Sequence, residues 1–127
     1  MMLCIFVKTH HMNEIKNLEA VSRPTGIANI IGNKGGMMVS FWIHNTSFCF
    51  ISSHLAAKPH NVDLRKSNYY DLITNLRTGV HEIESIFQFD YVFWFGDMNF
   101  RVDGKIISIL RGEINLIFKI RINFNIF

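Results

Sequence analysis

The sequence contains very little proline and cysteine for its length. Its 127 residues include only 2 Pro and 2 Cys, whereas 49% are hydrophobic and 12 are Phe. Scarce proline with abundant apolar side chains excludes a disordered chain and predicts packed globular material. Cys4 and Cys49 each lie in an apolar run, so we expect two reduced thiols in an intracellular protein rather than a disulfide framework.

The usual zinc-ligand spacings and any segment long enough to cross a membrane are also missing. No Cys-x-x-Cys or His-x-x-x-His pair occurs, which leaves a hard cation bound by oxygen atoms as the metal option. The apolar run at 2–7 is too short to cross a bilayer, and Lys8 with two histidines follows it where a leader peptide would have small residues. We therefore expect a cytoplasmic location.

Charge of one sign is not strongly in excess. The formal net charge is +3, and no block of like charges appears before the C-terminal quarter of the chain. Such a surface attracts polyanions mildly through its summed field, so polyphosphate, nucleic acid and anionic membrane all stay open on charge alone.

Hydrophobic periodicity and turn residues predict alternating strands and helices, which indicates an α/β fold. The expected strands lie at 2–7, 38–43, 48–52 and 91–95, and the expected helices at 13–20, 63–76 and 82–87. Polar residues at 44–47 predict a hairpin turn, and the apolar run at 91–95 is typical of a central strand. The helix at 63–76 should place Leu64, Leu72 and Leu76 on its buried side and Arg65 and Asn68 on its polar side.

The last part of the chain differs in composition from the rest. Residues 105–127 are rich in Ile, Asn and Phe, with a possible helical turn at 106–111 and an alternating strand pattern from 114 to 126. A run of this kind, with little charge and no proline, is also typical of an aggregation-prone edge, and its narrow composition suggests a truncated or mispredicted chain end. We therefore separate a domain at 1–104 from a tail at 105–127.

The strongest candidate site is the segment WFGDMNFR at 94–101. Gly96 permits a close backbone approach at the end of the predicted strand, and Asp97 and Asn99 follow it two residues apart. Asp97 could accept a proton from water and Asn99 could donate to a phosphoryl oxygen, as a hydrolase requires. A Gly-Asp-x-Asn segment is also compatible with a simple polar turn.

Two further segments could contribute to the same site. In GNKGG at 32–36, glycines allow close approach to an anion and Lys34 supplies positive charge, although a glycine-rich turn alone explains the pattern. His54 follows the strand at 48–52 and could bind phosphate or orient a carboxylate, although a lone histidine is often structural. Each segment borders a predicted strand, so all three could meet at one sheet edge.

The order of these motifs resembles the central part of the inositol polyphosphate 5-phosphatase catalytic domain. The resemblance covers about residues 3–103, and its Trp-x-Gly-Asp-x-Asn-aromatic-Arg motif is highly specific. The segments that carry it are TGIAN at 25–29, GNKGG at 32–36, TSFCF at 46–50, SHLAA at 53–57, RKSNYY at 65–70 and FWFGDMNFR at 93–101.

The resemblance implies part of a deoxyribonuclease-I-like sandwich, an incomplete four-layer α/β/β/α domain, with Mg2+ as cofactor. It implies hydrolysis of the 5-phosphate of phosphoinositides or inositol polyphosphates, association with a membrane surface, and no nucleic-acid partner. Asp97 would activate the attacking water, Asn99 would hold the phosphoryl group, and His54 would hydrogen-bond near the phosphate. Asn33 and Lys34 match a loop that approaches other phosphates, and Arg101 would support the site.

Several expected family features do not occur in this sequence. Gly36 stands where the family usually has alanine. The family's upstream asparagine and metal-holding glutamate would precede Met1, and its Pro-Ala-Trp-Cys-Asp-Arg and Ser-Asp-His stretches would follow Asp103, so no metal ligand is identified. We therefore expect a fragment with little activity of its own. The alternatives are a phosphodiesterase or nuclease of the same superfamily, a non-catalytic phosphoinositide-binding chain and a truncated product without a stable fold.

Overall fold

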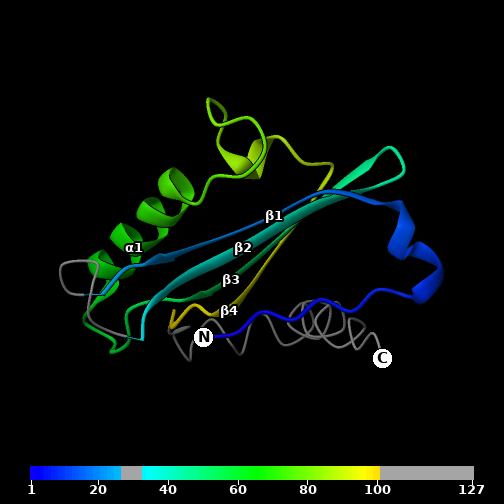
Figure 1. Cartoon of the computed structure of the whole chain (residues 1–127). Coiled ribbons are helices and arrows are strands. Elements are labelled where there is room, and N and C mark those ends of the chain that lie inside the picture. The colour runs from blue at the N-terminus through cyan, green and yellow to red at the C-terminus, as the bar shows by residue number, and fades with distance from the viewer. Residues whose placement is uncertain (27–32, 101–127) are drawn as a thin grey trace, which may run out of the picture.

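The computed structural model describes residues 1–26 and 33–100 and shows a mixed α/β arrangement (Figure 1). The elements follow one another along the chain as η1 (Thr9–Glu14), β1 (Ile15–Pro24), β2 (Gly35–Ile43), β3 (Thr46–His54), α1 (Val62–Asn75), η2 (Ser85–Phe87) and β4 (Tyr91–Asp97). The predicted α/β class is thereby confirmed. The tail at 105–127, its boundary at 104 and the elements predicted within it lie outside the described residues.

The strands form one sheet in the order β1-β2-β3-β4. The first two pairings are antiparallel, whereas β3 and β4 are parallel and α1 lies between them in sequence. A parallel pair needs a crossover connection, which α1 supplies while covering one side of the sheet (Figure 1). The strand predicted at 91–95 is present as β4, but in the described part of the chain it ends the sheet order, so its predicted central position is wrong there.

The hairpin predicted around 44–47 is confirmed between β2 and β3. Ile43 pairs with Thr46, so only His44 and Asn45 form the turn. His44 has a φ of 52°, a left-handed conformation that two-residue hairpin turns require at a central position. The predicted turn was two residues too long because Thr46 and Ser47 already belong to β3.

The two elements predicted at the N-terminus are wrong. Residues 2–7 form no strand but run along the side of the sheet away from α1, with partly buried and exposed side chains alternating (Figure 1). The helix predicted at 13–20 is replaced by the end of η1 and by β1, which pairs with β2 from Ile15 to Pro24. An irregularity between Lys16 and Glu19 interrupts that pairing. The long-range ladder to β2 overrides the local helical pattern.

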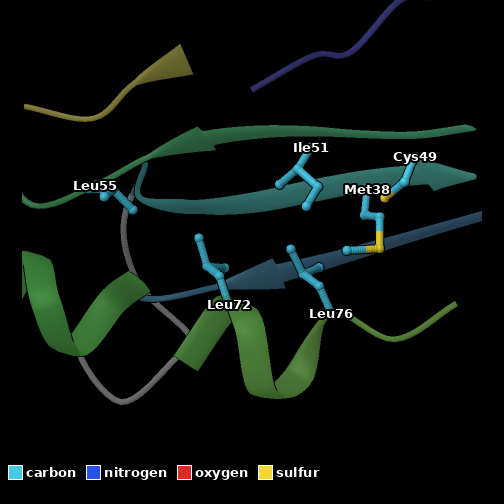
Figure 2. Close-up of a cluster of buried hydrophobic side chains, with 6 residues drawn as sticks. All are labelled: Met38, Cys49, Ile51, Leu55, Leu72 and Leu76. Atoms are coloured by element: carbon cyan, nitrogen blue, oxygen red, sulfur yellow. The ribbon is translucent and has the colours of Figure 1, made fainter. Parts of the chain in front are cut away.

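The core lies between α1 and the sheet. Leu72 and Leu76 project from the helix side toward Met38, Ile51 and Cys49 on the strands (Figure 2). These five side chains and Leu55 are at most 2% exposed. Burial raises the pKa of the Cys49 thiol to about 12, so this cysteine is an inert part of the core.

The helix predicted at 63–76 is confirmed as α1, but its buried side differs from the prediction. Arg65 and Asn68, expected on the polar face, are 1% and 5% exposed, whereas Leu64 is 50% exposed. The buried residues Arg65, Asn68 and Leu72 follow helical spacing, so polar side chains share the face that meets the sheet. The helix predicted at 82–87 is reduced to the single 3-10 turn η2.

The opposite side of the sheet carries an aromatic face. Phe41 stacks on Phe50 with ring centroids 5.7 Å apart, and Phe50 stacks on Phe93 at 5.0 Å. Phe48 and Tyr91 add a further stacked pair at 5.5 Å. None of the described helices is both long and apolar enough to cross a bilayer.

Candidate functional site

The three sequence segments singled out above meet in one row across the sheet. Pro24 of β1 pairs with Gly35 of β2, Gly35 pairs with His54 of β3, and His54 pairs with Asp97 of β4. This row lies at the end of the sheet where β3 and β4 finish, which is the rim that α/β folds use for binding and catalysis. The rim therefore joins the glycine-rich segment, the histidine and the aspartate.

His54 and Asp97 face each other across the β3–β4 pair. The distance from His54 Nε2 to Asp97 Oδ2 is 3.6 Å, within reach of an ion pair when the imidazole is protonated. The His54 side chain is 28% exposed and that of Asp97 is 64% exposed. In this arrangement the solvent-exposed carboxylate of Asp97 can take up a proton from water, and the more sheltered imidazole of His54 can bind an anion.

Asn99 fixes the other carboxylate oxygen and joins the two segments that leave the sheet. Its backbone N–H donates to Asp97 Oδ1 at 3.0 Å, which closes a local turn. Its side-chain Nδ2 donates to the carbonyl oxygen of Leu55 at 3.0 Å, and the Leu55 N–H donates to the carbonyl oxygen of Asp97 at 3.0 Å. The φ of Asn99 is 53°, a conformation that asparagine tolerates better than most residues. These bonds hold together the two segments that carry His54, Asp97 and Asn99.

Gly96 is required for the close approach of β3 and β4 at this rim. Its φ is 121°, and a Cβ atom built there would lie 2.1 Å from the carbonyl oxygen of Ser53. A side chain at this position would push the two strands apart just before His54 and Asp97. The close-approach role predicted for this glycine is what the geometry shows.

Asn33 and Lys34, which were predicted to approach other phosphates, directly precede Gly35 in the same row of residues. Lys34 Nζ donates to Asn33 Oδ1 at 2.9 Å in an exposed position, and the Lys34 carbonyl oxygen accepts from Thr25 N–H at 3.1 Å. A cation and an amide thus lie one and two residues before Gly35, at the edge of the rim. Arg101, also predicted to support the site, lies outside the described residues.

Arg65 and Asn68, for which the sequence indicated no role, position the segment after His54. Arg65 donates to the carbonyl oxygens of Ala56, Lys58 and Pro59 at 3.3, 2.6 and 3.2 Å, respectively. Asn68 Oδ1 accepts from the Ala56 N–H at 3.1 Å. Asn99 binds the carbonyl oxygen of Leu55, which directly precedes the backbone that Arg65 and Asn68 hold. Their spacing with Leu72 on one helical face was the signal available in the sequence.

A second bond ties the beginning of the rim to α1. Arg23 donates from Nε and Nη2 to the two oxygens of Asp71, at 3.1 and 2.9 Å. The hydrogen bond to Asp71 raises the pKa of the Arg23 guanidinium, which stays charged. This paired geometry keeps the last residues of β1 in place beside Gly35 and Gly36.

The rim supplies only part of a magnesium site. Mg2+ prefers oxygen ligands and often uses one or two carboxylates together with water and substrate phosphate. Asp97 can offer one carboxylate, but across residues 1–26 and 33–100 no third His, Cys, Asp or Glu joins it and His54 in a cluster of ligand atoms. Within those residues the donor set for Mg2+ is therefore incomplete. The roles predicted for His54, Asp97, Asn99, Asn33 and Lys34 stay predictions.

Comparison with known proteins identifies a family and several similar sequences. The family described as Endonuclease/Exonuclease/phosphatase family 2 matches residues 1–115. The chain is 39% identical over 111 residues to phosphatidylinositol 3,4,5-trisphosphate 5-phosphatase 2A of Danio rerio, covering 85% of this chain and 9% of that protein. It is 37% identical over 121 residues to inositol-1,4,5-trisphosphate 5-phosphatase 1 of Schizosaccharomyces pombe, covering 92% and 11%.

A solved structure agrees in fold as well as in sequence. The inositol polyphosphate 5-phosphatase domain of SPsynaptojanin, in complex with inositol (1,4)-bisphosphate and a calcium ion, matches with a TM-score of 0.64 and 36% identity. The match covers 87% of this chain and 32% of that one. The predicted resemblance and the predicted partial deoxyribonuclease-I-like fold are thereby confirmed. The chain spans about a third of the solved domain and a tenth of the curated relatives.

Proposed function

Because the chain belongs to the endonuclease/exonuclease/phosphatase family 2, we propose that it carries part of the active site of a phosphoinositide or inositol polyphosphate 5-phosphatase. The observation that supports this most directly is the rim cluster, in which His54 Nε2 lies 3.6 Å from Asp97 Oδ2 and Asn99 N–H binds Asp97 Oδ1. The names of the two relatives reported above, both 5-phosphatases of an inositol phosphate or a phosphoinositide, support the substrate class.

In the proposed reaction a water oxygen bonds to the 5-phosphorus as the bond from phosphorus to the inositol 5-oxygen breaks. Asp97 Oδ2 takes a proton from that water, because its other oxygen is already bound by the Asn99 N–H. The leaving oxygen takes up a proton and becomes the 5-hydroxyl group, and inorganic phosphate is released. His54 binds a phosphoryl oxygen, and the side chain of Asn99 helps to hold the same group.

The proposed cofactor of the complete domain is Mg2+, which neutralises charge on a transferring phosphoryl group. The residues described here do not complete its ligand set, so the remaining ligands would come from substrate, water and protein outside the described ranges. Losing one positioned acid or base typically costs about 100- to 10,000-fold in rate. We therefore propose that this chain alone has little turnover.

The substrate is proposed to be a phosphoinositide at a cytoplasmic membrane surface or a soluble inositol polyphosphate, and not nucleic acid. Lys34 and Asn33 stand at the edge of the rim, where they can contact a phosphate other than the one removed. The net charge of +3 favours such an anion mildly. Arg101 follows Phe100 in the sequence and is proposed to support the site.

Binding of inositol 1,4,5-trisphosphate to the full chain, measured by calorimetry, tests the proposal without requiring turnover. Lys34→Gln should weaken binding by about tenfold, because one charge-assisted contact is lost. Lys8→Gln is the matched control, since it removes the same charge from an exposed position beside η1. It should leave the affinity nearly unchanged.

Two further measurements separate the alternatives. A short DNA duplex that binds as tightly as inositol trisphosphate would favour a nuclease-like member of the superfamily. Phosphate release from phosphatidylinositol 4,5-bisphosphate should be slow and should fall further in Asp97→Asn. Tight binding of inositol trisphosphate, without any phosphate release that Asp97→Asn lowers, would support the non-catalytic alternative. Absence of inositol trisphosphate binding would overturn the proposal.

A further inference from the structure

A second cluster of ionisable side chains lies at the end of the sheet opposite the rim. In the 3-10 helix η1, His11 and Glu14 are three residues apart and so fall on the same side of the helix. Glu14 directly precedes Ile15, which pairs with Ile43, and His44 directly follows Ile43. The antiparallel register therefore brings Glu14 opposite His44. The 3-10 helix η1 and the turn between β2 and β3 lie at the same end of the sheet (Figure 1).

The ligand atoms of these three residues converge on one point. Glu14 Oε2 lies 2.5 Å from His11 Nδ1 and 3.3 Å from His44 Nε2. All three ligand atoms lie within 4.8 Å of one another. Within the described ranges this is the one group of three or more His, Cys, Asp or Glu side chains arranged in this way. The side chains are 39%, 32% and 66% exposed for His11, Glu14 and His44, so a cation can reach them from solvent.

We propose that His11, Glu14 and His44 form a binding site for a divalent transition metal of the Zn2+ type, separate from the phosphatase rim. Two imidazoles and one carboxylate are a ligand set that Zn2+ accepts, with a fourth position open to water. Tetrahedral bonds of about 2.0–2.2 Å place neighbouring ligand atoms roughly 3.3 Å apart. The Glu14–His44 separation of 3.3 Å matches that spacing, and the His11–Glu14 hydrogen bond opens slightly when the metal binds.

The chemistry of the ligands distinguishes this site from one for Mg2+. Imidazole suits zinc and related transition metals, whereas Mg2+ demands oxygen ligands in octahedral geometry. Short-range sequence spacing could not indicate the site, because the histidines at 11 and 44 are joined by strand pairing and not by one helix. Metal binding would connect η1 to the β2–β3 turn and stabilise the folded chain.

Calorimetric titration of Zn2+ into the full chain, with Mg2+ in large excess, tests this site. One Zn2+ should bind per chain and raise the thermal midpoint. His44→Asn removes a ligand while keeping a residue that tolerates the positive φ of the turn, and Glu14→Gln removes the carboxylate. Each change should weaken zinc affinity about 100-fold or more, since even outer partners of metal ligands are worth about 10- to 100-fold.

His81→Asn is the matched control, because it removes an exposed histidine from a turn outside the cluster. It should leave zinc affinity and the thermal shift unchanged. Circular dichroism checks that each variant folds, and His11→Gln replaces any variant that does not. Three results would each overturn the proposal. They are wild-type zinc affinity in both His44→Asn and Glu14→Gln, a loss of zinc affinity in His81→Asn equal to that in the cluster variants, and displacement of Zn2+ by Mg2+.

Discussion

The two faces of the sheet differ in how completely they are covered. On the face toward α1, the side chains of Met38, Cys49 and Ile51 are at most 2% exposed (Figure 2). On the other face the aromatic rings stack on one another, yet Tyr91 is 53% exposed and Phe95 is 38% exposed. One face is a closed core, and the other is an apolar surface without a complete covering in the described residues.

This difference shows where the candidate site lies within the architecture. Side chains alternate along a strand, so His54 shares a face with Phe48 and Phe50, and Asp97 shares it with Phe93 and Tyr91. His54 and Asp97 therefore lie at the rim end of the open aromatic face. The closed core lies on the other side of the same strands and holds them in place. A partial sandwich has this property, and the chain covers only 32% of the solved domain that it resembles.

Gly96→Ala should give the greatest loss of stability, because it disturbs the strand pair shared by both faces. The new Cβ would lie 2.1 Å from a backbone oxygen at a φ of 121°, so neither atom can move away easily. We expect the free energy of unfolding to fall by more than about 4 kcal/mol, measured by urea denaturation.

Gly36→Ala is the control for that change. Its Cβ would meet the methyl groups of Leu72 and Leu76 at 2.8 and 3.0 Å, which are flexible side-chain ends on the closed face. The expected loss is about 1–2 kcal/mol. Equal losses at the two glycines would contradict the claim that β3 and β4 need this close approach.

Truncating one large side chain on each face tests the comparison directly. Leu72→Ala leaves a cavity at a fully buried position and should lower the free energy of unfolding by about 3 kcal/mol. Phe50→Ala removes a larger side chain but from the partly exposed face, where it loses stacking with Phe41 and Phe93, and should cost about 1.5 kcal/mol. The measurement is urea denaturation of both variants under one condition. A greater loss in Phe50→Ala would show that the aromatic face is effectively closed.

The sequence predicted those parts of the fold in which local pattern and tertiary packing agree. The β2–β3 hairpin, α1 and β4 combine a clear period with clear turn residues, and each was found close to its predicted position. The convergence of His54 and Asp97 could be expected because both follow strands whose ends meet at one edge. The order of the motifs along the chain also indicated the family.

Other parts of the molecule depend on contacts that a single sequence does not show. β1 has no alternating pattern strong enough to identify it, and only its pairing with β2 fixes it as a strand. Arg65 and Asn68 were assigned to the wrong face of α1, because polarity suggested solvent whereas both satisfy buried backbone groups. The His11, Glu14 and His44 cluster likewise depends on the register between β1 and β2.

Acid titration should reveal the smallest effect, at the end of the closed face farthest from the rim. Asp90 Oδ2 accepts hydrogen bonds from the backbone N–H of Ser47 at 2.8 Å and from its hydroxyl at 2.7 Å. These bonds lower the pKa of Asp90 below its ordinary value of 3.8, the backbone bond contributing most. The carboxylate therefore stabilises the fold above about pH 4, and that contribution is lost as the pH falls through the lowered pKa.

Comparing the urea midpoints of wild type and Asp90→Asn from pH 7 down to pH 3 isolates this contribution from those of other carboxylates. Wild type should be the more stable protein at pH 7. The difference in urea midpoint should narrow below about pH 4, where Asp90 of the unfolded chain becomes protonated before the same carboxylate in the folded chain. Ser47→Ala removes the hydroxyl donor but keeps the backbone donor, so it should reduce the pH dependence without abolishing it. A difference in urea midpoint that stays constant over the whole pH range would contradict this prediction. It would show that the pKa of the Asp90 carboxyl is the same in the folded and unfolded chains, so that its bonds to Ser47 do not stabilise this end of the closed face.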